Sequence, residues 1–160
     1  MNLTPRQISL VQSTFRKLDP IAKTFAELFY TRLFALEPGL RVMFKDQDED
    51  WERRGDSLKH FMAALVSNLN KLDCLKRAVQ ALARSSFGRM LRPSAFDAAG
   101  QALIWTLARG LEDEFTDETK LAWLDAYSLL AETLADSLAT TLMVANSLSG
   151  APGRAGLHAG

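Results

Sequence analysis

The sequence lacks the features that mark secreted and membrane-spanning proteins. Its single cysteine, Cys74, cannot form an intrachain disulfide, which suits a reducing cytoplasm. The N-terminal stretch MNLTPRQISLVQ has no basic region followed by an apolar run, as a signal peptide would have. The longest run without charge, Ser137 to Gly153, contains Ser, Thr, Asn and Gly and is too polar to span a membrane. We therefore expect a cytoplasmic protein with no membrane segment.

The chain also lacks an excess of charge of either sign. Nineteen basic and nineteen acidic side chains cancel, so the overall charge gives no reason to expect a nucleic-acid partner. The 160 residues have the length of one domain, and a hydrophobic content of 48% is ordinary for a soluble globular protein. We predict a globular domain at residues 1–148 and a flexible tail, rich in glycine and alanine, at residues 149–160.

Helical periodicity is the pattern that the sequence does contain, and no segment alternates as a strand would. Thr4, Pro5 and Gln7 form a capping box that predicts the first helix start. Asp73 and Thr116 are the candidate N-caps of two later helices. The pattern predicts an all-α fold of six or seven helices, near residues 4–18, 20–36, 40–44, 51–69, 73–88, 93–111 and 116–148.

Two of these helices have informative inward faces. In the last helix the predicted inward stripe is Leu124, Tyr127, Ala131, Leu134 and Leu138. In the helix at 73–88, Leu75, Val79 and Leu82 lie on the inward face, and the next inward position holds Ser86. A serine there is either a small residue bonded back to the helix backbone or the mark of a functional position.

With this layout the chain resembles a bacterial single-domain globin, of the kind related to the heme domain of flavohemoglobins. The resemblance covers about residues 3 to 140. Its matching stretches are LTPRQISLVQ, FAELFYTRLFALEPGLRVMF (25–44), AFDAAGQALIWTL (95–107) and AWLDAYSLLAETL (122–134). It implies the globin fold, a 3-on-3 sandwich of helices around a heme pocket.

The resemblance further implies which residues surround the heme. It places Phe44 flat against the heme and Tyr30 over the iron on the distal side. Arg54 matches the gate position of the distal helix, and Leu58 follows one turn later. Phe96 matches an aromatic residue near the proximal side.

The iron-binding histidine of the family is replaced by serine in this chain. The family's proximal motif is Arg-Arg-His followed by a small apolar residue and glycine, whereas residues 83–88 read ARSSFG, which puts Ser86 at the histidine position. The only histidines are His60 and His158, and a serine hydroxyl is a poor iron ligand near neutral pH. Tyr30 is the alternative iron ligand, as tyrosinate from the distal side, although a distal tyrosine is more often a hydrogen-bond donor.

Each of these positions also has a plainer interpretation. Arg54 is either solvated or paired with a heme propionate. His60 lies about 200° around the helix from Leu58 and faces water if Leu58 faces the heme. Cys74 is a small buried or half-buried thiol. Core packing alone would account for Tyr30, Phe44, Leu58 and Phe96.

Two further features predict partners. The charges between residues 74 and 96 are all positive, which indicates a solvated helix face, a docking surface for an acidic partner, or propionate anchors. These cations are Lys76, Arg77, Arg84, Arg89 and Arg92. The last helix stays apolar through Leu148, past the expected core contacts. Since sensor globins dimerise through their last two helices, the resemblance implies a homodimer.

Three functions are compatible with this sequence. The first is a globin-fold protein with lost or altered heme ligation, which acts as a non-oxygen-carrying regulatory or ligand-binding module. The second is a heme-binding globin with an unusual axial ligand that binds or senses a diatomic gas. The third is an ordinary oxygen-binding globin whose proximal ligand was changed. Heme b is the possible cofactor in the last two cases. We expect no enzyme activity apart from heme chemistry, because no acid–base or nucleophile constellation is present.

Overall fold

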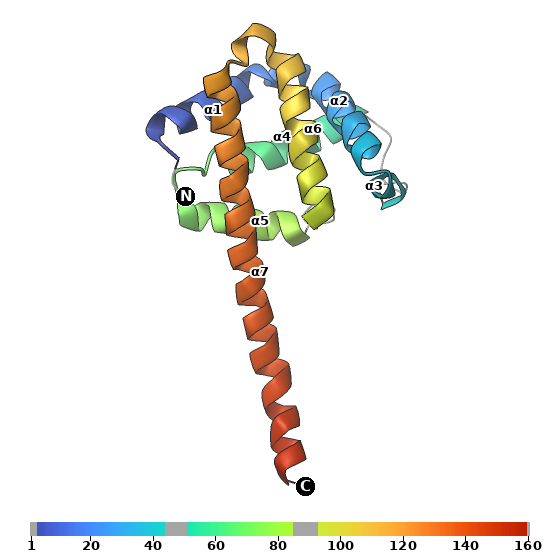
Figure 1. Cartoon of the computed structure of the whole chain (residues 1–160), viewed down its shortest axis with the longest axis vertical. Coiled ribbons are helices and arrows are strands. Elements are labelled where there is room, and N and C mark those ends of the chain that lie inside the picture. Colours follow the sequence, from blue (N-terminus) through green and yellow to red (C-terminus); the bar gives the residue numbers. More distant parts are fainter. Residues whose placement is uncertain (1–2, 44–50, 85–92, 160) are drawn as a thin grey trace.

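The computed structural model describes residues 3–43, 51–84 and 93–159, but not the side chains of residues 42–43, 51–52, 93, 138–145 and 148–159. Within these ranges the chain contains helices and no strand (Figure 1). No helix among the described residues combines the length and the apolar character that crossing a membrane requires. The helices are α1 (Pro5–Lys17), η1 (Asp19–Ile21), α2 (Ala22–Leu36), α3 (Gly39–Met43), α4 (Trp51–Val66), α5 (Leu72–Arg84), α6 (Pro93–Leu111), η3 (Glu112–Glu114) and α7 (Asp117–Ala159).

Six of the helices pack as two layers of three. In one layer α4 contacts both α1 and α5, and in the other α6 contacts both α2 and α7. The layers are joined where α4 packs on α2 and where α7 packs on α1 and α5. Figure 1 shows α6 and α7 side by side, with α5 running across α7. The predicted all-α class and its 3-on-3 arrangement are therefore confirmed.

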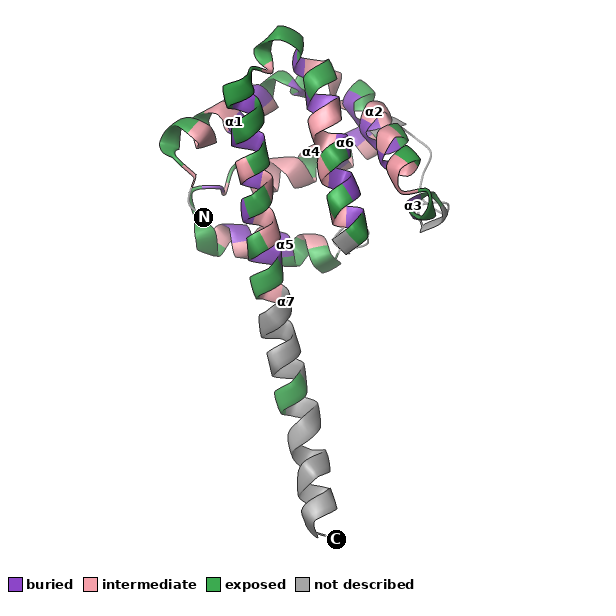
Figure 2. Cartoon of the chain, viewed as in Figure 1, coloured by how far each residue is buried: buried purple, intermediate pink, exposed green. Residues whose placement is uncertain are grey.

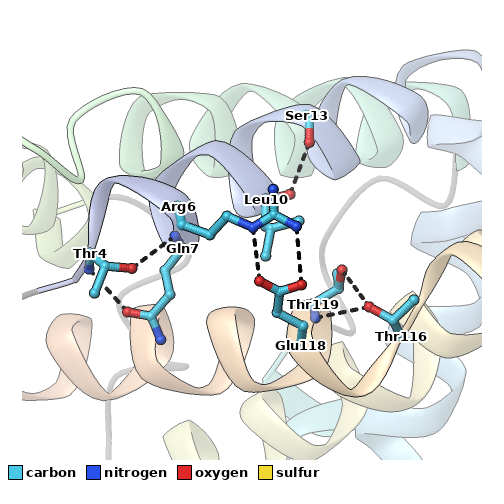
Figure 3. Close-up of polar contacts among 8 residues, drawn as sticks. All are labelled: Thr4, Arg6, Gln7, Leu10, Ser13, Thr116, Glu118 and Thr119. Carbon is cyan, nitrogen blue, oxygen red and sulfur yellow. Dashed lines mark hydrogen bonds and ion pairs between the residues drawn. The ribbon is translucent and has the colours of Figure 1, made fainter.

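Side-chain caps fix where the first and last helices begin. The Thr4 side chain accepts a hydrogen bond from the Gln7 backbone N–H at 3.1 Å, and the Gln7 side chain accepts from the Thr4 N–H at 3.0 Å. The predicted capping box is thus formed. The Thr116 hydroxyl accepts from the Thr119 N–H at 3.2 Å, so Thr116 is the predicted cap of α7. Figure 3 shows both caps where α1 lies beside α7.

Several predicted helix boundaries were wrong. The second helix begins with a 3₁₀ turn, and its α-helical part starts at Ala22 rather than at residue 20. The fourth helix ends at Val66 rather than near residue 69, because the Ser67 and Asn68 side chains bond back to carbonyls of the preceding turn at 2.6 Å. Asp73 lies inside the first turn of α5, which starts at Leu72 and not after Asp73.

Two predicted features lie at the ends of helices. Gly88, the predicted stop of the fifth helix, lies outside the described residues. Within the described part of the chain, α5 spans Leu72–Arg84. The bounds of α7 extend to Ala159 and so include the tail predicted at 149–160. The flexibility of this tail stays a prediction.

The inward face of α7 differs from the predicted stripe at Leu124, whereas Tyr127 and Leu134 of that stripe do line the core. Leu124 was predicted to face the core but is 41% exposed, whereas its neighbour Trp123 is 3% exposed. The Trp123 ring N–H donates to the Thr14 hydroxyl of α1 at 3.0 Å, and this bond sets the rotation of α7. Figure 2 shows the resulting alternation of buried and exposed residues along α6 and α7.

A glycine allows α4 to pack tightly on α2. A Cβ atom at Gly55 would lie 3.0 Å from the carbonyl oxygen of Ala22, closer than side chains normally approach backbone. Gly55 therefore brings α4 close to α2, and the next turn of α4 carries Leu58 into the core.

We expect the Arg6→Ala variant to raise the pKa of Glu118. Arg6 donates two hydrogen bonds to this carboxylate at 2.8 and 3.1 Å (Figure 3), which lowers the pKa of Glu118 below its usual value. Since the folded pKa is depressed, the pair stabilises the fold above the unfolded pKa and loses this effect as the pH falls through the folded pKa. An NMR titration of the carboxyl group measures the shift. The matched Arg16→Ala variant should leave the Glu118 titration unchanged, and equal titrations in all three proteins would contradict the assignment.

Candidate functional site

The main candidate site is an apolar cavity of about 120 Å³ lined by residues of α2, α4, α5, α6 and α7, which we call the inner cavity. The residues around it are almost all aliphatic or aromatic. Its lining consists of Phe29, Leu58, Phe61, Met62, Leu65, Val66, Val79, Leu82, Phe96, Ala99, Leu103, Trp123, Tyr127, Leu130 and Leu134.

The two polar groups that reach this lining from α7 are already paired. The Tyr127 hydroxyl donates to the Phe96 carbonyl at 2.5 Å, and the two rings stack with centroids 4.4 Å apart. Burial raises the pKa of Tyr127, with a smaller contribution from the charge of Asp97, so the phenol stays protonated. The Trp123 N–H is held by Thr14. The inner cavity therefore presents hydrocarbon surface and one thioether, that of Met62.

Tyr30 lies beside this cavity rather than in its lining. It is 2% exposed and packs edge-on against Phe29, with ring centroids 5.3 Å apart. The Arg54 guanidinium lies 5.7 Å from the centre of the Tyr30 ring, a cation–π arrangement. Burial raises the pKa of Tyr30 well above its usual value, and the nearby charge of Arg54 only partly opposes this. Tyrosinate formation at Tyr30 is thus disfavoured in this structure.

The sequence model of one family, described as Globin, matches residues 27–134, which is more than half of the chain. The chain belongs to the globin family. It is similar to flavohemoproteins of Vibrio cholerae (28% identical over 134 residues, 84% of this chain and 34% of that protein), Deinococcus radiodurans (26% over 132 residues, 82% and 33%) and Candida albicans (27% over 135 residues, 84% and 34%). This globin chain spans about a third of the length of these curated relatives.

The structure brings together part of the predicted globin pocket. Leu58 and Phe96 line the inner cavity from α4 and α6. Tyr30 and Arg54 contact each other next to it. Phe44 and Ser86 lie outside the described residues, so their places in the pocket stay predictions.

Some lining residues of this globin were not identified as site residues from the sequence. Trp123 was missed because the stripe of α7 was assigned through Leu124. A better signal was the spacing of Trp123, Ala126, Tyr127 and Leu130, at i, i+3, i+4 and i+7. Phe29 and Met62 also border the cavity, which only the packing of the helices shows.

Globins hold heme iron through a proximal histidine, so we compared the described residues with that requirement. His60 is exposed on α4 and does not line the inner cavity, and the His158 side chain is outside the described residues. Cys74 is half-buried on α5 and is also absent from the lining. Among the described residues, no three His, Cys, Asp or Glu side chains gather as a metal-binding group.

The size of the inner cavity limits which molecules it can hold. Its apolar and aromatic lining suits the face of a porphyrin, but about 120 Å³ is well below the roughly 300–1,000 Å³ of typical ligand and cofactor pockets. An engineered apolar cavity of about 150 Å³ takes benzene. The described lining therefore suits a small apolar molecule, and it includes no histidine.

The predicted partner surfaces are only partly described. Arg77 and Arg84 are exposed on α5 and Lys76 is half-buried, and none of the three forms an ion pair with another described residue. Arg89 and Arg92 lie outside the described residues. The docking of an acidic partner on these cations and the homodimer through the last two helices both stay predictions.

Proposed function

We propose that this globin is a ligand-binding protein whose inner cavity takes a small apolar molecule, without a histidine-ligated heme and without oxygen carriage. The observation that carries the proposal is the described lining of the cavity, in which the Tyr127 and Trp123 polar groups are already paired and which includes no histidine. Such a site offers dispersion contacts and no strong ligand for iron. The proposed role is binding, in a regulatory or carrier function, and not catalysis.

We expect toluene to bind the purified protein with a stoichiometry of one, measured by isothermal titration calorimetry. The Ala99→Leu variant should weaken this binding at least about tenfold, because Ala99 lines the cavity and the larger side chain fills it. Ala108→Leu is the matched control, since Ala108 is exposed on the same helix. Equal toluene binding by both variants and the wild type would contradict the site.

A heme-binding globin is the second candidate, and the family match favours it. Titration with hemin, with and without imidazole, separates the two. The proposal requires that no saturable, sharpened Soret band forms in either case. A complex without imidazole would replace the proposal with heme held by an unusual ligand. A complex that forms or changes spin state only with imidazole would indicate a globin that has lost its proximal ligand but kept its heme pocket.

A further inference from the structure

Two arginines lie against one tryptophan on the face where α2 packs on α6. The guanidinium carbon of Arg32, from α2, is 5.1 Å from the centre of the Trp105 ring, and that of Arg109, from α6, is 4.1 Å from the same ring. Both distances are within the range of cation–π attraction. Arg109 is exposed, and Arg32 and Trp105 are half-buried. We call these three residues the arginine–tryptophan cluster.

The cluster holds two positive charges and no counter-charge from the described part of the chain. Neither arginine forms an ion pair with another described residue. The Nε atom of Arg32 is buried and has no hydrogen-bond partner among the described residues. Like charges near one ring repel each other, and a buried donor without an acceptor costs free energy. Carboxylates brought to this face would therefore lower the free energy of the cluster.

Unpaired carboxylates lie next to the cluster in the sequence. Glu112 and Asp113 of η3 follow Arg109 closely, are exposed, and form no ion pair with another described residue. Their neighbour Glu114, in contrast, pairs with Lys17. Glu112 has a φ of 51°, in the left-handed region that few residues other than glycine adopt. The backbone is thus strained at a position that carries one of these unpaired charges.

A face that carries both signs of charge suits a second copy of itself better than another partner. An acidic partner would be repelled by Glu112 and Asp113, and a basic partner would be repelled by the arginines. A twofold axis brings the same patch of two subunits together, so that the cations of each copy can meet the carboxylates of the other. Tryptophan and arginine are also enriched at the energetic centres of protein interfaces.

We propose that this protein forms a twofold homodimer through the arginine–tryptophan cluster and η3. Arg109 of each copy pairs with Glu112 and Asp113 of the partner subunit, and the Trp105 ring lies at the centre of the contact. This dimer differs from the one predicted through the last two helices, because it uses α2, α6 and η3 and leaves α7 outside. It does not depend on the ligand of the inner cavity.

Charge reversal tests the pairing by analytical ultracentrifugation of the full chain over a range of concentrations. Arg109→Glu makes η3 and its neighbour acidic, and the double variant Glu112→Lys/Asp113→Lys makes the same face basic. Each variant should weaken its own dimer at least about tenfold, because attraction becomes repulsion at both symmetric contacts. Arg77→Glu, which alters an exposed cation of α5, is the matched control and should leave the dissociation constant unchanged.

An equimolar mixture of the two charge-reversed proteins is the decisive sample. In the mixture the reversed charges face each other with opposite sign, so a heterodimer should form with a dissociation constant within about threefold of the wild-type dimer. Variants that weaken the dimer alone but do not restore it when mixed would overturn the direct pairing. A wild-type chain that stays monomeric up to about 1 mM would overturn the dimer itself.

Two further variants locate the contact. Leu121→Glu/Leu124→Glu places charge on the exposed leucines of α7 and should leave dimerisation unchanged. If it disrupts the dimer while the charge-reversed variants do not, the contact lies on α7 and the proposal is wrong. Trp105→Phe, which keeps an aromatic ring for the fold, should weaken the dimer at least about threefold. An unchanged dissociation constant in this variant would overturn the central place of Trp105.

Discussion

Replacing Trp123 by alanine is expected to lower the free energy of unfolding by about 3–5 kcal/mol, the range for deleting a buried large aromatic side chain. The indole is 3% exposed, lines the inner cavity and donates its N–H to Thr14. Its loss removes packing between α7 and α1 and enlarges an existing cavity, so the surroundings have no simple way to collapse around the gap. A domain with a total stability of about 5–15 kcal/mol would lose a large share of it.

Urea unfolding followed by far-ultraviolet circular dichroism measures this change, with the slope of the transition as a check on the denatured state. Trp123→Phe is the companion variant, because it keeps an aromatic ring and loses the hydrogen bond. It should cost less than the alanine variant and remain folded even if the alanine variant does not. Two variants that both unfold within about 1 kcal/mol of the wild type would mean that Trp123 is not the anchor of α7.

Leu33→Ala and Leu124→Ala are expected to differ sharply although both delete the same atoms from a helix. Leu33 lies on α2 and is 0% exposed, so the loss of its side chain should cost about 2–5 kcal/mol. Leu124 is exposed on α7, so its replacement should change stability by about 0.5 kcal/mol or less. The inward stripe predicted from the sequence includes Leu124 and so predicts a large cost there as well.

The same urea experiment compares the two leucine variants. Leu121→Ala, at a position 55% exposed on α7, is a second control and should match Leu124→Ala. A loss of more than about 2 kcal/mol in Leu124→Ala would show that Leu124 faces the core, as the sequence pattern predicted. It would also require a rotation of α7 that breaks the hydrogen bond between Trp123 and Thr14.

Features that depend on neighbouring residues were predictable from the sequence. The caps at Thr4 and Thr116 formed as predicted, because a cap joins groups three residues apart. The helical class followed from apolar spacing in the same way. Helix ends were less accurate: the bonds from Ser67 and Asn68 that end α4 compete with helix continuation, and their outcome depends on what packs around that turn.

The candidate site includes residues that the sequence could predict and residues that it could not. The sequence identified Leu58 and Phe96 through family resemblance, and the structure places both in the lining of the inner cavity. It could not predict that Tyr30 packs outside that lining or that Trp123 packs inside it, since both depend on the rotation of helices distant in sequence. A second cavity, of about 330 Å³, was not predicted at all, because it forms where α1, η1, α2 and α4 meet.

By itself the sequence determined the helical class, the resemblance to globins and the absence of any histidine between residues 61 and 157. These follow from composition, from local spacing and from the identity of single residues. Only the tertiary structure decided how large the inner cavity is, which polar groups in its lining are already paired, and that Leu58 and Met62 also line a second cavity. A cavity is the space that side chains from several helices leave between them, and its volume depends on how those helices pack and not on the pattern of any one of them.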